Sequence, residues 1–145
     1  MEWTLKPFSA LTAAELFEIY KNRVDVFVVE QNCPYHEVDD RDLTAQHLFA
    51  KQDGRLAAYC RLIDEPQAVR IGRVLVAPHA RGQGLARALM AVALDEAGKQ
   101  HPHKPVHIQA QLYLAQFYQS LGFQTASETY LEDGIPHVDM VLELS

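Results

Sequence analysis

Six consecutive residues near the middle of the chain have the composition of an anion-binding turn at a helix start: Arg81-Gly82-Gln83-Gly84-Leu85-Ala86. The first backbone N–H groups of a helix lack partners within it, and the helix dipole adds partial positive charge there. Glycine lets the backbone approach a ligand without an intervening Cβ, and Arg81 adds a permanent cation. The segment therefore predicts a phosphate site, although the same six residues also fit an ordinary turn before a helix.

This segment differs from the two best-known phosphate loops. It lacks the closing Gly-Lys-Ser/Thr of a Walker loop and the third glycine of a dinucleotide-binding fingerprint, whose strand would also open a βαβ unit. The chain shows neither a G-x-S-x-G pattern nor a Cys-His nucleophile pattern. These absences argue against a P-loop nucleotide hydrolase, a dinucleotide-dependent enzyme, and a serine or cysteine hydrolase.

A second group of chemically active side chains lies between residues 30 and 42, where Arg41 is the only cation among five carboxylates. The five are Glu30, Glu37, Asp39, Asp40 and Asp42. Such a segment could attract an ammonium-bearing substrate, and mutual repulsion would raise the pKa of one carboxyl group. The alternative is a solvated acidic surface loop, which charge runs usually form.

Histidines and cysteines give weaker signals. His101, His103 and His107 lie close together around two prolines, but a metal site needs fixed geometry and usually a further ligand. We therefore expect a solvated loop there and no metal. Cys33 and Cys60 have no CxxC spacing and are interpreted as reduced thiols, with Cys60 inside a strand as part of the core.

Strand-like and helix-like stretches alternate along the chain, which predicts one α/β domain with a mixed sheet over residues 1–145. Thr12 and Glu15 form a capping-box pattern at the start of the first helix, and Asp53-Gly54 predicts a hairpin turn. The apolar stripe of this helix comprises Leu16, Tyr20, Val24 and Phe27. The other predicted helices are 82–98 and 112–121. The predicted strands are 3–8, 47–51, 55–63, 69–76, 106–110, 123–130 and 138–144, with a loop at 30–44.

The bulk composition excludes several classes of protein. The chain has 145 residues, of which 48% are hydrophobic and 22% charged, with a formal net charge of -6. An acidic chain is a poor binder of nucleic acid, because neutralising phosphates requires clustered Lys and Arg. No apolar run approaches the roughly 20 residues of a membrane span. The N-terminal residues lack the pattern of a signal peptide, so we expect a cytoplasmic protein without membrane or nucleic-acid partners.

Two segments resemble the signatures of the GNAT acetyltransferase superfamily. Residues 81–86 fit its pattern of Gln or Arg, two residues, Gly, one residue, and Gly or Ala. The strand ending Arg73-Val74-Leu75-Val76 precedes this segment, and an Ala- and Leu-rich helix follows it. Residues 115–123, Ala-Gln-Phe-Tyr-Gln-Ser-Leu-Gly-Phe, resemble the second signature of the superfamily. The expected element order, β-α-β-β-β-α-β-α-β-β, is also that of the GNAT fold.

Within this superfamily the chain resembles the ElaA-like family over nearly its whole length. The resemblance rests on residues 23–31, on Cys33-Pro34-Tyr35, on Asp39 and Asp42 before His47-Leu48, and on residues 132–137. It implies acetyl transfer from acetyl-CoA directly to a primary amine of a small molecule, a polyamine or a peptide. It does not define the acceptor, and it allows a homodimer, because homodimers are common among relatives.

The resemblance also implies how the donor is held. The backbone N–H groups of Arg81, Gly82, Gln83, Gly84, Leu85 and Ala86 would bind the pyrophosphate of coenzyme A. The pantetheine arm would lie along Val74, Leu75 and Val76 as an added strand does, where the adjacent parallel strands splay apart. A backbone N–H near Leu75 or Val76 would face the thioester carbonyl as an oxyanion donor. The superfamily often has a cofactor-binding Asn on the next strand, where this chain has Gln109 and Gln111.

Proton transfer needs an acid and a base. Tyr118 matches the phenol that approaches the sulfur in this superfamily, although its position on a helix beside Phe117 also fits core packing. A phenol can donate a proton to the departing thiolate. An alkylamine of pKa about 10.4 is mostly charged at neutral pH, so a carboxylate or imidazole must deprotonate it. Glu37 is the first candidate for this base, and His47 is the next.

Two other functions remain open. Acyl-homoserine-lactone synthases share the fold, and Arg23, Val26 and Phe27 fit their R-x-x-V-F pattern. Those enzymes are longer, carry a conserved Trp soon after the first helix and lack the pyrophosphate motif in its usual form, whereas the only Trp here is Trp3. A non-catalytic acyl-CoA-binding module is the other alternative, and it would not need the phenol of Tyr118.

Overall fold

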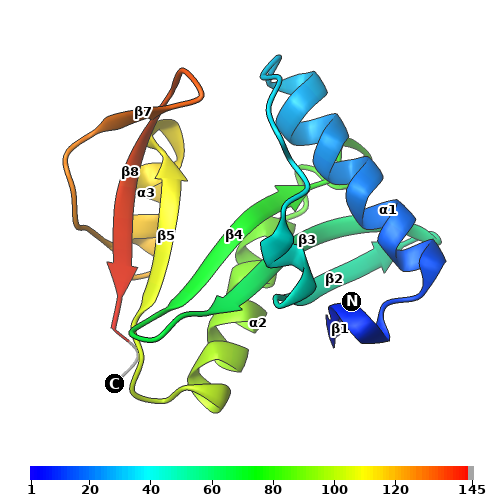
Figure 1. Ribbon diagram of the computed structural model, residues 1–145, viewed down its shortest axis with the longest axis horizontal. Coiled ribbons are helices and arrows are strands. Elements are labelled where there is room, and N and C mark those ends of the chain that lie inside the picture. The colour runs from blue at the N-terminus through cyan, green and yellow to red at the C-terminus, as the bar shows by residue number, and fades with distance from the viewer. Residues whose placement is uncertain (144–145) are drawn as a thin grey trace.

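The computed structural model describes residues 1–143, and within them the chain forms an open eight-stranded sheet flanked by helices (Figure 1). The strand order is β1-β2-β3-β4-β5-β8-β6, with β7 paired to β8. The strands are β1 (Trp3–Pro7), β2 (Gln46–Gln52), β3 (Arg55–Asp64), β4 (Val69–Val76), β5 (Val106–Gln111), β6 (Gln124–Thr125), β7 (Tyr130–Glu132) and β8 (Ile135–Leu142). Among the strands of residues 1–143, only β4 and β5 pair in parallel, so the predicted mixed α/β sheet is confirmed.

Helix α1 (Ala13–Val24) begins where the sequence places it. The Thr12 hydroxyl accepts from the Glu15 backbone N–H, and the Glu15 carboxylate accepts from the Thr12 N–H, which completes the capping box. The chain then continues as a π-helix over Asp25–Glu30. The predicted stripe is partly wrong, because Val24 is exposed and the fully buried line is Ile19, Arg23 and Val26.

Helix α1 packs on one face of the sheet, and helix α2 (Leu85–Gln100) and the short α3 (Ala115–Ser120) cover the opposite face. Helix α2 starts three residues later than predicted, because Gly82 and Gly84 both adopt a positive φ and hold residues 82–84 in a turn. It also continues two residues beyond Gly98. Leu89, Met90 and Ala93 are fully buried against the sheet.

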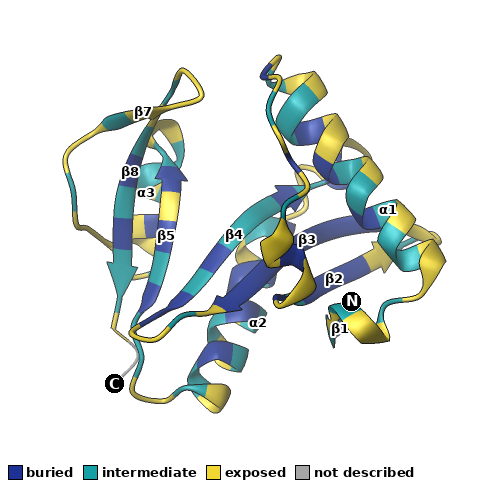
Figure 2. Ribbon diagram, in the orientation of Figure 1, coloured by how far each residue is buried: buried dark blue, intermediate teal, exposed yellow. Residues whose placement is uncertain are grey.

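The sheet divides two hydrophobic clusters. The larger one joins the sheet to α2 and α3, and the smaller one joins it to α1 through Ile19, Val26 and Leu75. Strand β3 is buried along nearly its whole length because helices cover both of its faces (Figure 2). Cys60 lies in this strand and is fully buried, as predicted.

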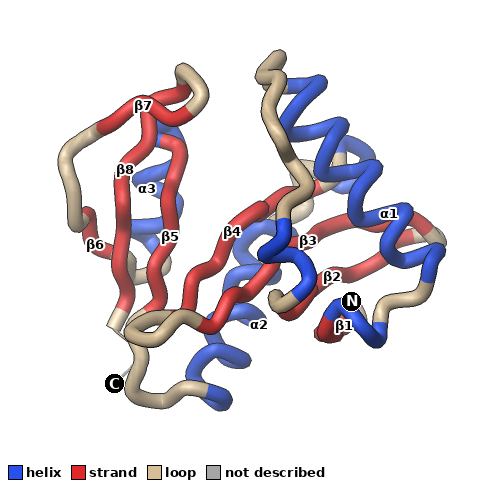
Figure 3. Tube along the Cα trace, viewed as in Figure 1, coloured by secondary structure: helices blue, strands red, loops and turns tan. Residues whose placement is uncertain are grey.

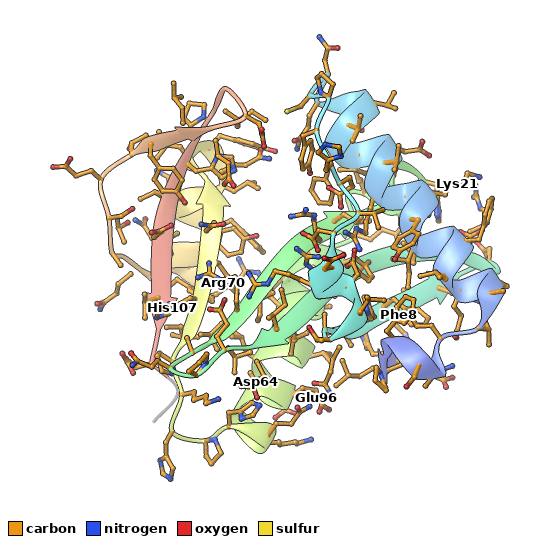
Figure 4. The ribbon with its side chains drawn as sticks, in the orientation of Figure 1. Phe8, Lys21, Asp64, Arg70, Glu96 and His107 are labelled. Atoms are coloured by element: carbon orange, nitrogen blue, oxygen red, sulfur yellow. The ribbon has the colours of Figure 1, made fainter. Side chains whose placement is uncertain are left out.

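Strands β4 and β5 meet at one end and then diverge. Their parallel pairing is confined to Val69 with Val106 and Arg70 with His107, and Figure 4 labels Arg70 and His107 at this closed end. Beyond it, β4 stays with β3 and β5 stays with β8. Figure 1 shows the resulting V between the two halves of the sheet. The later part of β4 therefore has an edge free of strand pairing.

A bulge lies in β4 at the start of this free edge. Tyr59 pairs with Leu75 and Arg61 pairs with Gly72, so Arg73 and Val74 together face the single residue Cys60. Arg73 has a φ of 53°, which an L-residue adopts only at some cost. Past the bulge the alternation of faces is inverted, so Val74 packs toward α2 while Leu75 packs toward α1.

The predicted strand at 123–130 is wrong. Only Gln124–Thr125 and Tyr130–Glu132 are strands, and residues 126–129 leave the sheet between them. The Ser127 hydroxyl accepts the backbone N–H of Asp139, so a side chain replaces a ladder partner of β8. Figure 3 shows this irregular segment between the two short strands. Among residues 1–143, no helix has the length and apolar character to cross a membrane.

Candidate active site

A cavity of about 680 Å³ fills the V between β4 and β5. Its walls come from β4 and the loop that leads to α2, from β5 and α3, from the π-helix with the segment after it, and from the β7–β8 hairpin. Ten of the predicted site residues line it: Val74, Leu75, Val76, Arg81, Gly82, Gly84, Leu85, Ala86, Gln111 and Tyr118. Gln109 lines it too. Gln83 does not, and its side chain instead accepts from Gln52.

The loop before α2 presents a row of free backbone donors. The N–H groups of Gly82 through Ala86 hydrogen-bond no group within residues 1–143, and Gly84 offers no capping side chain. Gly82 and Gly84 have φ values of 81° and 76°, and a Cβ built on either would meet nothing within 4 Å. Successive outward N–H groups in such a turn form an anion-binding concavity. The loop thus fits a pyrophosphate.

The free edge of β4 supplies a second set of backbone groups. Ala77 donates its N–H to Ala57 of β3, so Ala77 is a hydrogen-bonded partner in the ladder. Because bonded and non-bonded positions alternate in an antiparallel pair, the N–H and C=O of Val76 point away from β3 and toward the cavity. The Val76 carbonyl accepts from Arg81 Nε at 3.0 Å, in agreement with this direction. The geometry thus favours Val76 over Leu75 as the donor that faces a bound carbonyl.

Residues 30–33 cross the cavity and contact both of its walls. The guanidinium of Arg81 donates two hydrogen bonds of 3.0 Å to Glu30. Gln111 Nε2 donates to Gln31 Oε1 at 3.2 Å, and the Cys33 thiol reaches the carbonyl of Asp133 at 3.5 Å. We call residues 30–33 the strap, and it joins the end of the π-helix to the phosphate loop, to β5 and to the β7–β8 turn.

Tyr118 projects from α3 into the same cavity. Its side chain is 6% exposed and stacks edge-on against Phe117 and Phe123. No group within residues 1–143 hydrogen-bonds its hydroxyl. Burial raises the pKa of this phenol above its usual value, so the phenol stays protonated at neutral pH. Tyr118 therefore offers a free hydrogen-bond donor in an apolar wall.

Glu37 is placed differently from a solvent-facing base. Its carboxylate accepts from Arg23 Nε and Arg73 Nε, both at 2.7 Å, and from the hydroxyl of Tyr35. The side chain is buried and does not line the cavity, although Arg73 and Tyr35 do. The structure therefore places Glu37 as an ion-paired support beneath two cavity residues.

Within the acidic segment, Glu37 and Asp42 are buried and Asp39 is half-buried, whereas Glu30 and Asp40 are exposed. Asp42 is buried and binds Arg23 and Arg61, and Asp39 binds Arg61 through two hydrogen bonds. Hydrogen bonds from Arg61 lower the pKa of Asp39. Burial acts to raise the pKa of Asp42, but the bonds and charges of Arg23 and Arg61 outweigh it and lower that pKa. The expectation of a raised carboxyl pKa is wrong for these two residues, because distant arginines neutralise them.

His47 is fully buried and lies outside the cavity lining. Its Nε2 is 2.9 Å from the carbonyl of Asp42, so Nε2 carries a proton, and its Nδ1 accepts from the Tyr59 hydroxyl at 2.7 Å. Burial lowers the pKa of the imidazole. Both ring nitrogens are thus occupied in a neutral side chain, which the structure does not bring to the cavity.

His137 reaches the cavity but was not among the predicted site residues. The sequence carries one signal for it, since Val138 and Met140 are apolar and alternate with His137 and Asp139. In β8 the two apolar residues face the core. The two polar residues are half-buried on the open face of the sheet. This alternation predicts that His137 lies on the polar face of the strand, but it does not predict that the face borders a cavity.

A mixed sheet with two splayed parallel strands, and a glycine turn leading to a helix beside them, defines a GNAT-type acyltransferase fold. The chain also matches the family model described as Acetyltransferase (GNAT) domain over residues 15–144. The protein therefore belongs to the GNAT acetyltransferase family, whose members bind acyl-CoA.

The chain is also similar to individual proteins over its full length. It is 40% identical to protein ElaA of Escherichia coli over 149 residues, with 99% of this chain and 97% of ElaA covered. It is 47% identical to a UPF0039 protein of Schizosaccharomyces pombe over 147 residues, with 99% and 98% covered. The predicted relationship to the ElaA-like family is thereby confirmed.

Solved structures agree with the fold. The crystal structure of Escherichia coli ElaA superposes with a TM-score of 0.94 and covers 99% of this chain and 100% of ElaA. An acyl-CoA N-acyltransferase of Pseudomonas aeruginosa, 45% identical, gives a TM-score of 0.93 with 97% and 98% covered. The acyl-homoserine-lactone synthase LasI gives a TM-score of 0.83 at 12% identity, which shows a shared fold alone.

Proposed function

We propose that this protein transfers an acetyl group from acetyl-CoA to a primary amine of a small molecule, a polyamine or a peptide. The row of unpaired backbone N–H groups at Gly82 to Ala86 carries the proposal, because it opens onto the cavity where β4 lacks a strand partner. One ligand with a pyrophosphate and an extended amide-bearing arm fits both features. Acetyl-CoA has these two parts.

Each group in the cavity has a separate role in the proposed acetyl transfer. The backbone of Gly82 to Ala86 holds the pyrophosphate, and the free edge of Val74 and Val76 pairs with the arm. The N–H of Val76 donates to the thioester oxygen as negative charge develops on it. Tyr118 donates a hydrogen bond to the sulfur, whose own basicity rises in the same apolar wall. Gln111, held by Gln31, is the candidate for the polar contact to the donor on β5.

The end of the cavity at the β7–β8 hairpin has the charge to attract a cationic acceptor. Glu132 and Asp133 line the cavity at the β7–β8 hairpin. Neither forms an ion pair with a Lys or Arg within residues 1–143. Arg70 lines the cavity near its closed end and carries positive charge there. Uncompensated carboxylates at one end of a cavity attract an ammonium group.

Thiol release from acetyl-CoA tests the proposal. The purified protein is mixed with acetyl-CoA and spermidine, L-lysine or a short peptide with a free N-terminus, and free coenzyme A is measured with a thiol reagent. We expect turnover with at least one amine and an N-acetylated product by mass spectrometry. Acetyl-CoA binding without turnover for any amine would instead favour a non-catalytic acyl-CoA-binding module. Absence of acetyl-CoA binding would overturn the donor site.

A further inference from the structure

His137 occupies a defined place at the acceptor end of the cavity. It pairs with Gln111 of β5 on one side and with Tyr130 of β7 on the other. Its side chain is 12% exposed and lines the cavity that also contains Tyr118 and Val76. The imidazole therefore shares one cavity with the candidate acid and with the candidate carbonyl donor.

The backbone fixes the tautomer of this imidazole. Nδ1 lies 2.7 Å from the carbonyl oxygen of Ile135, two residues earlier on the same strand. A carbonyl oxygen can only accept a hydrogen bond, so Nδ1 must carry a proton. In the neutral ring the lone pair then resides on Nε2. A nitrogen with a free lone pair is what a general base requires.

Neighbouring side chains hold the ring in place. Tyr130 stacks on it with a centroid distance of 6.1 Å and an interplanar angle of 21°, and the Tyr130 hydroxyl donates to Asp139 at 2.6 Å. Glu132 Oε2 lies 4.0 Å from Nε2. A carboxylate at this distance stabilises an imidazolium. The titratable groups recorded against the ring are Tyr130 and Glu132 of β7, and Asp139 of β8 accepts from the Tyr130 hydroxyl.

We propose that His137 Nε2 is the base that deprotonates the ammonium group of the acceptor, with Glu132 stabilising the imidazolium that results. This inference rests on the proposed function. Glu37 and His47 themselves lie outside the cavity lining and are already hydrogen-bonded to other groups, whereas no group within residues 1–143 hydrogen-bonds His137 Nε2. His137 thus combines access to the cavity, a free lone pair and a nearby carboxylate.

The step balances as follows. The ammonium group loses one proton to His137 Nε2, which later releases it to water. The neutral nitrogen forms a bond to the thioester carbon, and the carbon–sulfur bond breaks with its electron pair remaining on sulfur. Tyr118 gives a proton to that sulfur, and the second N–H proton, lost as the amide forms, restores the phenol. The products are the acetamide, free coenzyme A and one proton in solvent.

The test compares His137→Gln with the wild-type protein, using whichever of spermidine, L-lysine and the peptide the wild type acetylates fastest. We expect kcat/KM at pH 7 to fall about 100-fold, the lower range for a lost general base, while acetyl-CoA affinity stays unchanged. His107→Gln is the matched control, because His107 is half-buried on the adjacent strand β5 and does not line the cavity (Figure 4). Glu132→Gln, at a more exposed position, should lower kcat/KM several-fold.

The pH dependence separates a base from a structural residue. As pH rises from 7 toward the pKa of the acceptor amine, about 10.4 for an alkylamine and about 8 for a peptide N-terminus, more acceptor is already neutral, so the deficit of His137→Gln should shrink toward wild-type activity. A deficit equal at every pH, or His137→Gln activity within about twofold of wild type, would overturn the assignment. If His137→Gln does not fold, unchanged activity of Glu132→Gln overturns it instead. A wild-type protein without turnover would overturn the proposed function, and the assignment with it.

Discussion

Arg23, in the last turn of helix α1, carries a positive charge that is fully buried from solvent. Its guanidinium donates to the carboxylates of Glu37 and Asp42 and to the Glu37 carbonyl, and it lies against the rings of Tyr20 and Tyr59. Burying a charge is costly unless it is paired and hydrogen-bonded, and here both hydrogen-bonded partners, Glu37 and Asp42, come from 14 and 19 residues further along the chain. This residue therefore anchors the segment that leads to the cavity.

Removing Arg23 should destabilise the fold strongly. Arg23→Met leaves two buried carboxylates with one arginine each, Arg73 for Glu37 and Arg61 for Asp42. We expect the free energy of unfolding to fall by about 3 kcal/mol at pH 7, measured by urea denaturation. Lys21→Met, on the exposed side of the same helix, should change it by less than about 0.5 kcal/mol. Equal small effects of the two substitutions would show that the buried pairs contribute no net stability.

Tyr118 permits a narrower test of chemistry. Tyr118→Phe removes only a hydroxyl that bonds nothing within residues 1–143, so stability and acetyl-CoA affinity should be unchanged. If the phenol donates to the leaving sulfur, kcat should fall about 100-fold in the thiol-release assay. Tyr20→Phe removes a hydroxyl outside the cavity lining and serves as the control. Unchanged kcat for Tyr118→Phe would assign Tyr118 to packing.

At the scale of single residues, the sequence indicates which side chains can do chemistry but not which side chains they pair with. The carboxylates of residues 37–42 could be recognised as a group, because they are adjacent in the chain. Their neutralisation by Arg23, Arg61 and Arg73 could not, because those arginines come from α1, β3 and β4 and meet only in the folded sheet. The same limit explains why the sequence points to Glu37 as the base and not to His137.

At the scale of elements, the loop between β4 and α2 combines strain with open space. Gly84 has a φ of 76° at the helix start, and Gly54 has the same φ in the β2–β3 turn. A Cβ at either position would meet nothing within 4 Å. The two glycines therefore share the same φ and the same open surroundings, but only Gly84 lines the cavity.

This match makes a controlled pair of substitutions. Gly84→Ala and Gly54→Ala should each lower the free energy of unfolding by about 1 kcal/mol, because a Cβ is disfavoured at positive φ. Only Gly84→Ala should also weaken acetyl-CoA binding, by about tenfold or more, because its Cβ would stand between the backbone donors and the pyrophosphate. Isothermal titration calorimetry with acetyl-CoA measures the difference. Equal affinities for the two variants would refute the loop assignment.

Elements were predictable where their signals are local. The Thr12 and Glu15 capping box and the Asp53-Gly54 turn each lie within four residues, and both occur as expected. Strand β4 also has the predicted bounds. The prediction of one strand over 123–130 was wrong. The Ser127 hydroxyl takes the place of a backbone partner for Asp139, and this contact between distant residues is not visible in the sequence.

At the scale of the whole molecule, the cavity exists because two half-sheets diverge and the strap spans them. The strap contacts the phosphate loop, β5 and the β7–β8 turn, which belong to different parts of the chain. The pairs of Arg23, Arg61 and Arg73 with Glu37 and Asp39 hold the segment after the strap against the sheet. The stability of the whole fold is thus tied to the ionisation of a few buried groups.

His47 makes this link testable by pH. It is the fully buried histidine among residues 1–143, and burial lowers its pKa in the folded protein. Below the unfolded pKa of about 6.5 the unfolded chain binds a proton that the fold excludes, so stability should fall as pH decreases from there. The slope should reach up to about 1.4 kcal/mol per pH unit, before Asp39 and Asp42 add to it below about pH 4.

Urea denaturation between pH 8 and pH 5 measures this slope. His47→Gln should be less stable than wild type at pH 7, because its bonds to Tyr59 and Asp42 are weakened, yet its stability should vary less between pH 6.5 and 5. His103→Gln, exposed in the loop before β5, should keep the wild-type slope. A slope unchanged in His47→Gln would place the acid sensitivity elsewhere. A slope reduced only in His47→Gln would show that one histidine, buried away from the cavity, sets the acid limit of the whole fold.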